Sequence, residues 1–460
     1  MKQLFLATTA LAAVMITTAP AHAQADDTAS LRSELEAMRT EMERMRARIE
    51  QLESSGAETA QTAAQATELA QSAQATAEAM KVEQPDKPGV EIAWKGAPEI
   101  SGPGGWSFKP RGRLQFDAGT INAPDSTGVE DGFGSEVRRA RLGVQGDIPG
   151  GFGYKFEVDF AGGDAEIADA ILTYGSGGLT VTVGQHNTFQ SLEELTSSLN
   201  SSFIERAAFT DAFAFERRLG LSTQYKSGDF LLQAGAFSDN FGDIPGKSYS
   251  LDGRVVFMPR LGNAQLHLGS SIHYADLESG DAVRYRQRPL VHFTSTRFID
   301  TGTMPAHSEL GYGAEAAIIS GPVHAAGEAF WQSVDRSDAL PDADFFGGYV
   351  EIGYFLTGGD SRGYKNGVFD RVKPERPMGD GGFGALQVNL RYDYLDLNDG
   401  PVVGGTQDGY MASLIWTQTA YTRLMLNYAR LSYRDAAFPM AGGDASYDVD
   451  TIAMRAQIDF

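Results

Sequence analysis

The segment of the sequence whose residue types and spacing most clearly suggest chemistry is an alternating run of arginines, Arg284-Tyr285-Arg286-Gln287-Arg288. In an extended segment, side chains at i, i+2 and i+4 point the same way, so the three guanidinium groups would stand in a column at roughly 6–7 Å spacing. A guanidinium group is a rigid fork of donors that suits phosphate oxygens. Several weak sites in series also let an anion leave as well as enter. The run therefore predicts a binding path for phosphate or another small oxyanion.

A different placement of the same arginines remains open. On an outer loop they would be exposed, or bound to the phosphates of lipopolysaccharide, because basic residues beside anionic lipid head groups are common. We interpret Arg297, Lys247 and Arg260 as solvated loop or turn charges.

The elements that would carry these residues are strands. From Asp450 to Phe460 apolar side chains alternate with polar ones, which is typical of a strand with one apolar and one polar face. A strand of this kind that ends on an aromatic residue resembles the last strand of bacterial outer-membrane β-barrels. A soluble β-sandwich or propeller would use the same alternation and is the alternative fold.

Alternation and turn residues predict sixteen strands, an even number that places both ends of a barrel on the periplasmic side. Connections from an even-numbered predicted strand to the next odd-numbered one are mostly short turns. Connections from an odd-numbered strand to the next even-numbered one include two long segments, residues 187–216 and 276–308. Residues 358–383 follow an even-numbered strand and are nevertheless long. The predicted strands are 111–119, 136–147, 151–161, 168–174, 179–186, 217–226, 229–237, 249–258, 264–275, 309–319, 322–334, 345–357, 384–396, 405–417, 421–434 and 447–460.

The same alternation assigns charges of both signs to the inner face of the strands. The predicted inner basic residues are Arg113, Arg139, Arg141, Lys155, Arg254, Arg391, Arg423 and Arg455. The predicted inner acidic residues are Asp117, Glu157, Asp159, Asp252, Glu315, Glu328, Glu351 and Asp393. Such balanced rows would orient polar solutes in a general diffusion channel, so an anion preference must come from segments folded into the lumen.

Four regions are expected along the chain. Residues 1–23 read as a signal peptide, with Lys2, an apolar run and Ala21-His22-Ala23 as the cleavage site. A heptad pattern over residues 24–83 predicts a short periplasmic coiled coil, or else a single amphipathic helix. Residues 84–108 read as a linker and 109–460 as the barrel. A coiled coil implies a dimer or trimer.

Composition excludes several classes of function. Removal of residues 1–23 leaves 37 basic and 60 acidic residues, a net charge of −23, so nucleic acid is not an expected partner. The chain has no cysteine, and its seven histidines have no metal-ligand spacing, so we expect no metal site and no cofactor. Gly359-Asp360-Ser361-Arg362-Gly363 matches a nucleophile elbow, but a turn sequence follows it where a helix is required. We therefore do not expect an enzyme.

Several motifs resemble the phosphate-selective porins O and P, in order along nearly the whole barrel. They are Arg138-Arg139-Ala140-Arg141-Leu142-Gly143, Tyr154 to Phe160, Phe203-Ile204-Glu205-Arg206, Phe215 to Gly220, Gly348 to Gly358 and Arg391 to Leu397. This resemblance implies a homotrimer of 16-stranded barrels whose lumens are narrowed by inward segments that carry arginines. It implies that 187–216 is the constriction loop, 276–308 a second inward loop and 358–383 an inward periplasmic turn.

Together these patterns predict an all-β transmembrane protein, a 16-stranded antiparallel outer-membrane barrel that lets small anions, phosphate among them, diffuse passively. Expected partners are outer-membrane lipid and lipopolysaccharide. A general porin for small polar solutes and a coiled-coil protein that tethers the envelope remain alternatives. Arg206 and Glu205 in the constriction loop could instead form a mutual ion pair that holds the loop to the wall. The candidate anion-binding residues are Arg284, Arg286, Arg288, Arg206, Arg141 and Arg113.

Overall fold

The computed structural model describes Met42, Arg46 and residues 89–238, 248–336 and 340–460. The chain divides into two units, Met1–Pro88 and Gly89–Phe460. Met42 and Arg46, which are helical, are the described part of the first unit. The predicted signal peptide and the rest of the predicted coiled coil therefore lie outside the described residues.

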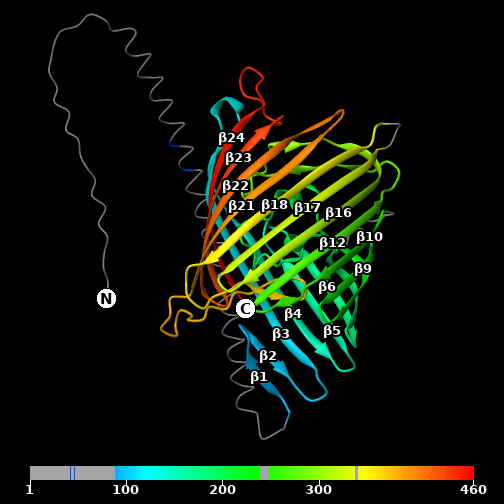
Figure 1. Ribbon diagram of the computed structural model, residues 1–460, viewed down its shortest axis with the longest axis vertical. Coiled ribbons are helices and arrows are strands. Elements are labelled where there is room, and N and C mark those ends of the chain that lie inside the picture. Colours follow the sequence, from blue (N-terminus) through cyan, green and yellow to red (C-terminus); the bar gives the residue numbers. More distant parts are fainter. Residues whose placement is uncertain (1–41, 43–45, 47–88, 239–247, 337–339) are drawn as a thin grey trace, which may run out of the picture. The chain divides into compact units, whose positions relative to one another are not determined.

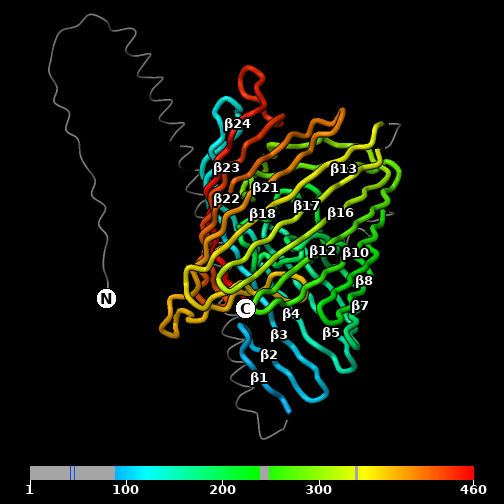
Figure 2. The backbone as a smooth tube through the Cα atoms, in the orientation of Figure 1, coloured from blue at the N-terminus to red at the C-terminus, as the bar shows by residue number. Residues whose placement is uncertain are grey.

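The described residues of the second unit form a closed antiparallel barrel of sixteen long strands (Figures 1 and 2). Each strand pairs with its neighbours in the ring, and β24 returns to pair with β3, which closes the barrel. The strands are β3 (Ser107–Asn122), β4 (Gly132–Ile148), β5 (Phe152–Asp159), β6 (Glu166–Ser176), β7 (Leu179–Asn187), β8 (Arg217–Ser227), β9 (Phe230–Phe237), β10 (Tyr249–Phe257), β12 (Ala264–Asp276), β16 (Met304–Ser320), β17 (Val323–Arg336), β18 (Ala343–Phe355), β21 (Ala385–Asp399), β22 (Val402–Thr419), β23 (Thr422–Arg434) and β24 (Tyr447–Asp459). The sixteen-stranded fold predicted from alternation is confirmed.

The two faces of each strand follow the alternation in the sequence. On β23, for example, Leu424, Leu426 and Tyr428 are exposed outward, whereas Met425 and Asn427 are buried on the inner face. The seam between β24 and β3 is closed by two backbone hydrogen bonds between Phe460 and Gly112, of 3.0 and 3.1 Å. Gly112 leaves room there for the Phe460 ring, which a Cβ at that position would displace.

The stretch expected to be a linker contains a β-hairpin. Strand β1 (Glu91–Trp94) pairs with β2 (Pro98–Ser101), and β2 pairs with the beginning of β3 through Ile100 and Phe108. The hairpin extends the edge of the barrel wall below β3 in Figure 1. Alternation of apolar and polar residues does not reveal these two short strands, because Pro98 and Gly96 interrupt it.

Three connections of the barrel carry short elements of their own. Residues 188–216 contain α2 (Leu192–Leu195) and α3 (Ala208–Ala212), and residues 277–303 contain β13 (Ala282–Val283), β14 (Arg286–Gln287) and β15 (Ile299–Asp300). The third connection, residues 356–384, contains β19 (Gly363–Lys365) and β20 (Val368–Asp370). Other short elements are η1 (Asp125–Thr127) and β11 (Arg260–Leu261).

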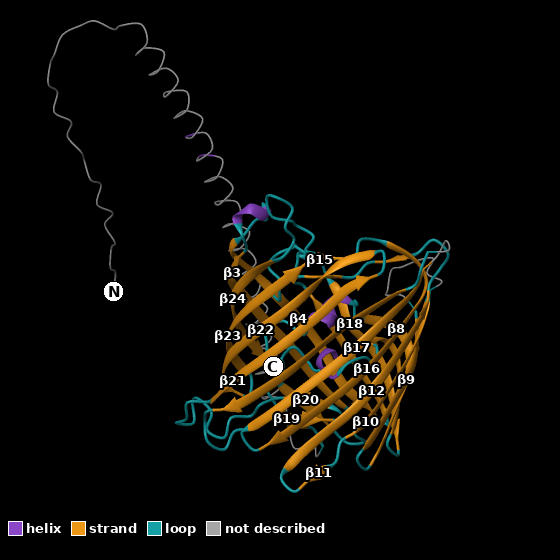
Figure 3. Ribbon diagram, turned by 45° about the horizontal axis from the view of Figure 1, so that its top comes forward, coloured by secondary structure: helices purple, strands orange, loops and turns teal. Residues whose placement is uncertain are grey.

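These connections fold into the barrel, and Figure 3 shows the two helices inside the ring of strands. Their apolar side chains join inner side chains of the wall in one buried cluster, which includes Phe203, Phe209, Phe298, Phe330 and Phe369. The apolar core of this protein therefore lies within the lumen. No helix among the described residues is long and apolar enough to cross a membrane.

Candidate anion-binding site in the constriction

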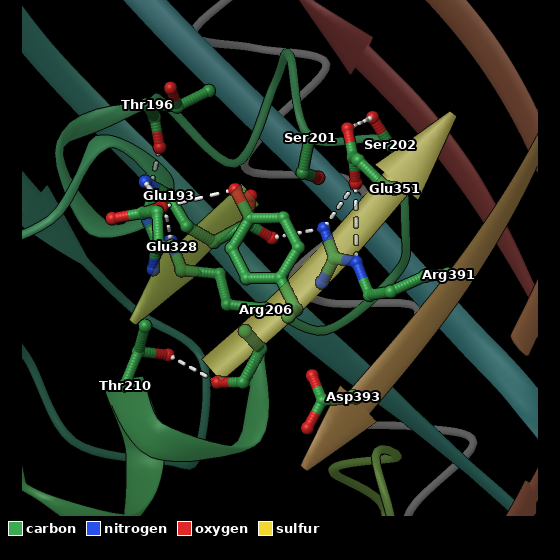
Figure 4. A network of polar contacts seen from close by, with 12 residues as sticks. Glu193, Thr196, Ser201, Ser202, Arg206, Thr210, Glu328, Glu351, Arg391 and Asp393 are labelled. Atoms are coloured by element: carbon green, nitrogen blue, oxygen red, sulfur yellow. Dashed lines mark hydrogen bonds and ion pairs between the residues drawn. The ribbon is translucent and has the colours of Figure 1, made fainter. Parts of the chain in front are cut away.

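The constriction loop, residues 188–216, is fixed to the wall at the N-termini of its two helices. The Glu328 carboxylate on β17 accepts hydrogen bonds from the backbone N–H groups of Leu192 and Glu193, at 2.8 and 2.7 Å. The Asp393 carboxylate on β21 accepts the N–H of Ala208 at 3.2–3.3 Å. Both carboxylates are buried and appear beside the loop in Figure 4. Free backbone N–H groups at a helix start favour such negative partners.

The rest of the loop is held by wall arginines. Arg391 on β21 donates to Glu193 of the loop at 2.8 Å and to Glu351 of β18 at 2.6 Å. Arg455 on β24 donates to the carbonyl of Ile204 and to Asp117, both at 2.7 Å. The loop therefore spans from β17 and β18 to β24.

These contacts change the interpretation of the wall charges. The residues predicted to face inward do so, but many are buried under the inward segments rather than lining open water. Arg254 pairs with Glu315 at 2.6 Å, and the side chains of both are almost fully buried. These opposed charges therefore pair with each other or hold the inward segments, rather than standing as free rows along open water.

A cavity of about 490 Å³ remains between the constriction loop, the second inward loop and strands β4 and β8. Its wall carries eight arginines and four carboxylates. The arginines are Arg138, Arg139, Arg206, Arg217, Arg284, Arg286, Arg288 and Arg297, and the acidic residues are Glu194, Glu205, Asp211 and Glu216. We call this space the arginine cavity.

The predicted triplet lies together in this cavity. Tyr285 and Gln287 are buried against the wall, so the alternation places Arg284, Arg286 and Arg288 on the cavity side. Tyr285 donates to Glu309 and accepts from Gln332 at 3.0 Å, which packs the segment against the barrel's inner wall. Arg284 and Arg286 are nevertheless exposed to solvent, so an exposed loop placement stays open as an alternative for these two.

The three arginines of the triplet differ in their partners. Arg284 forms a two-pronged pair with Asp300, at 2.8 and 2.5 Å. Arg288 donates to the Thr294 carbonyl at 3.1 Å and to Asp211 at 3.4 Å. The Arg286 backbone pairs with Asp300, whereas its side chain is exposed to the cavity and has no hydrogen-bond or ion-pair partner among the described residues.

The other predicted residues occupy different places. Arg206 lines the cavity, where it donates to the carbonyls of Glu193, Glu194 and Thr196, each at 3.0 Å, and pairs with the Glu194 carboxylate at 3.3 Å. Arg141 and Arg113 do not line this cavity. The first pairs with Glu157 and Asp159, and the second donates to Ser198 and Ser197 of the loop.

The predicted mutual pair between Glu205 and Arg206 is wrong. Glu205 instead accepts two hydrogen bonds from Arg138, at 3.0 and 3.2 Å, and pairs with Arg455 at 3.0 Å. Half-buried between these wall arginines, the Glu205 carboxyl has a pKa well below its usual range, because the charges of Arg138 and Arg455 outweigh desolvation. Glu205 therefore stays ionised and holds the loop to β4 and β24.

Sequence reasoning missed three arginines of the cavity. At a β-bulge in β4, Gln115 pairs with Arg139 and Phe116 with Val137, so Arg138 is an additional residue. A bulge redirects side chains, and both Arg138 and Arg139 reach the cavity although strict alternation admits one. Arg217 at the start of β8 pairs with Asp169 at 3.0 Å. Arg297, predicted to be a solvated charge, is half-buried in the cavity wall.

Three arginines of the cavity have no carboxylate within ion-pairing distance among the described residues. Arg139 is 8% exposed and donates to Gln115 at 3.0 Å. Arg297 donates to the Ser295 carbonyl at 3.3 Å, and its Nε has no partner. Burial and the neighbouring charges of Arg288 and Arg286 lower the pKa of Arg297 to about 10. With Arg286, these side chains leave positive charge that a solute anion would balance.

Two carboxyl groups beside the cavity respond to their surroundings in opposite directions. Desolvation raises the pKa of Glu194, although Arg206 opposes this effect. The pKa of Asp300 is lowered because its hydrogen bonds from Arg284 and Gly302 outweigh partial burial. No group of histidine, aspartate and glutamate residues in the described part of the chain is arranged to hold a metal ion.

Comparison with known proteins places this architecture in a family. Residues 108–460 match the family described as "Phosphate-selective porin O and P". The chain is 44% identical to a protein of Caulobacter vibrioides that is described as uncharacterized, over 454 residues that cover 95% of this chain and 91% of that protein.

Two solved structures are similar in fold alone. The anion-selective porin from Comamonas acidovorans has a TM-score of 0.51 and 13% identity, and the match covers 77% of this chain and 100% of that one. A loop-deletion mutant of OmpT, an outer membrane protein of Vibrio cholerae, has a TM-score of 0.51 and 11% identity, with the same coverage. Because the family match spans the whole barrel, the chain belongs to the phosphate-selective porin O and P family and is an outer-membrane porin.

Proposed function

We propose that this porin is a passive channel for small anions, with phosphate or a related oxyanion as the preferred solute. The observation that carries the proposal is the arginine cavity, where Arg139, Arg286 and Arg297 have no carboxylate partner within the described part of the chain. Guanidinium groups replace the hydration of an oxyanion with charge-assisted hydrogen bonds. The remaining arginines are paired with carboxylates, which weakens their binding of a solute anion. A bound anion can therefore be released.

The test is single-channel recording of the purified protein in a planar bilayer with chloride as the carrier. Phosphate should block the chloride current, and the half-blocking concentration should rise about tenfold or more in Arg286→Ala and Arg297→Ala, because each loses charged hydrogen-bond donors. The control is Arg430→Ala, since Arg430 is exposed on β23 and pairs with Asp448. A large current that is indifferent to phosphate would indicate a general diffusion porin instead.

We also propose that the porin is a homotrimer. Strands β5 and β9 have eight residues and β7 and β10 have nine, whereas β21 has fifteen and β22 eighteen. A tilted strand needs about 9–11 residues to cross the hydrocarbon layer. The barrel wall is therefore low at the short strands β5, β7, β9 and β10, and neighbouring barrels would cover this part of the wall better than lipid would.

For the N-terminal region we propose cleavage after residue 23 and a periplasmic coiled coil over residues 24–83, on the basis of the apolar run and the heptads in the sequence. Deletion of residues 24–88 from the mature chain should leave single-channel conductance unchanged. A loss of envelope integrity in cells with this deletion would instead support a tethering role for the segment.

A further inference from the structure

A second, much smaller cavity lies where the constriction loop meets the inward periplasmic turn. Its volume is about 10 Å³, and it shares no lining residue with the arginine cavity. That volume holds about one water-sized particle. Its wall includes Leu199 and Asn200 of the loop, Arg362 and Arg371 of the turn, and Arg423 of β23.

Arg362 and Arg423 hold the loop from two sides with their terminal nitrogens. Arg362 donates to the Ser202 hydroxyl at 2.8 Å and to the Asn200 carbonyl at 2.6 Å. Arg423 donates to the Ser201 carbonyl at 2.8 Å and to the Leu199 carbonyl. The Nε–H donors of both arginines are buried without a partner.

Their charges are only partly compensated: the Arg362 guanidinium lies 4.4 Å from the centre of the Phe369 ring, and its partner Ser202 donates to the Glu351 carboxylate. Arg362 is 6% exposed and Arg423 9%, and neither has a carboxylate within ion-pairing distance among the described residues. Arg371, the third arginine of the wall, pairs with Asp459. A buried charge without a partner is costly, and an unsatisfied buried donor adds to that cost. Two such arginines around one small cavity are therefore a built site for a negative ligand.

We propose that this cavity binds a single monatomic anion, chloride in the cell, between Arg362 and Arg423. A tetrahedral oxyanion needs more room than the cavity offers, whereas a halide ion can accept hydrogen bonds from both Nε–H groups. The bound ion holds the inward turn and the constriction loop to β23. The site is separate from the arginine cavity, so it does not depend on the proposed permeating solute.

Bromide provides a direct test with the intact protein. Crystals of the full chain grown in sodium bromide should show an anomalous peak between Arg362 and Arg423. Absence of the peak, with a water molecule in its place, would overturn the proposal. This result is independent of phosphate block, so the two proposals can fail separately.

Thermal unfolding in detergent provides the second test. When chloride replaces gluconate at constant ionic strength, Tm should rise in a saturable way, by about 2 °C or more. The rise should disappear in Arg423→Gln and persist in Arg260→Gln, since Arg260 is exposed on the short strand β11 and donates to Gln265. An equal rise in both variants would mean that the ion acts elsewhere. If Arg423→Gln does not fold, the bromide peak in the unchanged protein decides.

Discussion

At the scale of single residues, pairing determines which arginines of the cavity are available to a solute. Arg138, Arg206, Arg217, Arg284 and Arg288 each have a carboxylate partner. A guanidinium group that is already bidentate to a carboxylate has fewer donors left for phosphate. The number of arginines therefore overstates the capacity of the cavity to bind a solute anion. Arginines that already pair with a carboxylate contribute less to this capacity than the others.

Arg139 and Arg217 form a matched pair for testing this idea. Both line the arginine cavity, but Arg139 donates to a neutral glutamine, whereas Arg217 pairs with the Asp169 carboxylate. We expect Arg139→Gln to raise the phosphate concentration for half-block by about tenfold, and Arg217→Gln to change it by less than about threefold. Chloride-current block measures both. Equal effects would show that carboxylate pairing does not decide availability.

Glu194 should make the anion preference depend on pH. Because desolvation raises its pKa, this carboxyl gains a proton at a higher pH than an ordinary glutamate does. Acidification therefore neutralises this carboxylate at a higher pH than an ordinary glutamate, and chloride selectivity should increase as the pH falls. The reversal potential under a potassium chloride gradient, recorded over a series of pH values, measures this selectivity. Glu194→Gln should remove this pH response, and an unchanged pH response in this variant would contradict the assignment.

The sequence could predict the triplet but not the complete set of cavity residues. Arg284, Arg286 and Arg288 follow from a local spacing rule that the structure obeys. Arg138 enters the cavity because of a bulge, and a bulge depends on the neighbouring strand rather than on local alternation. Arg297 is half-buried because loops distant in sequence pack around it. Contacts of that kind leave no local pattern.

At the scale of elements, the constriction loop depends on carboxylates that lie far from it in sequence. Glu328 accepts two N–H groups at the start of α2 and a third hydrogen bond from Tyr349 at 3.0 Å. One buried acceptor therefore organises the loop and two strands. The sequence does not show which of these residues are partners, although it does predict the strands that carry them.

Replacing Glu328 with glutamine should loosen the loop without unfolding the barrel. The amide retains one acceptor oxygen but places an NH₂ group against a backbone N–H, which costs roughly 1–3 kcal/mol. We expect larger and noisier single-channel currents, with unchanged heat-modifiable migration in electrophoresis. Ser333→Ala is the control, because its hydroxyl bonds to Asp344 on an exposed part of the wall. Single-channel currents with the same size and noise as those of the unsubstituted protein would show that Glu328 does not hold the loop.

The positions of the long strands can be predicted from the sequence because the two faces of each strand lie in different environments. An outer face in lipid and an inner face against polar or packed protein impose a period of two over every strand. The predicted ranges therefore match all sixteen long strands, with differences at the ends, such as Met304 rather than residue 309 for β16. The hairpin of β1 and β2 does not span the membrane and lacks that pattern.

At the scale of the whole molecule, unequal strand lengths predict which wall meets a neighbouring copy. The chain has no cysteine, so single introduced cysteines report proximity directly. Val183 on short β7 and Leu414 on long β22 both face outward, with exposed fractions of 52% and 40%. If the proposed trimer forms through this wall, Val183→Cys should give cross-linked dimers in the purified protein, and Leu414→Cys should not. Preferential cross-linking at Leu414 would place the interface on the other wall.

The seam between β24 and β3 imposes an order on biogenesis. Arg455 on β24 pairs with Asp117 on β3, 338 residues earlier in the chain. Contacts so remote are entropically expensive to form and slow to find, and none of them can exist until β24 has been synthesised. Until then β3 and β23 are two unpaired edges that could join other chains. This porin must therefore travel as an unfolded chain with its edges shielded, and its barrel can close only after export has delivered β24.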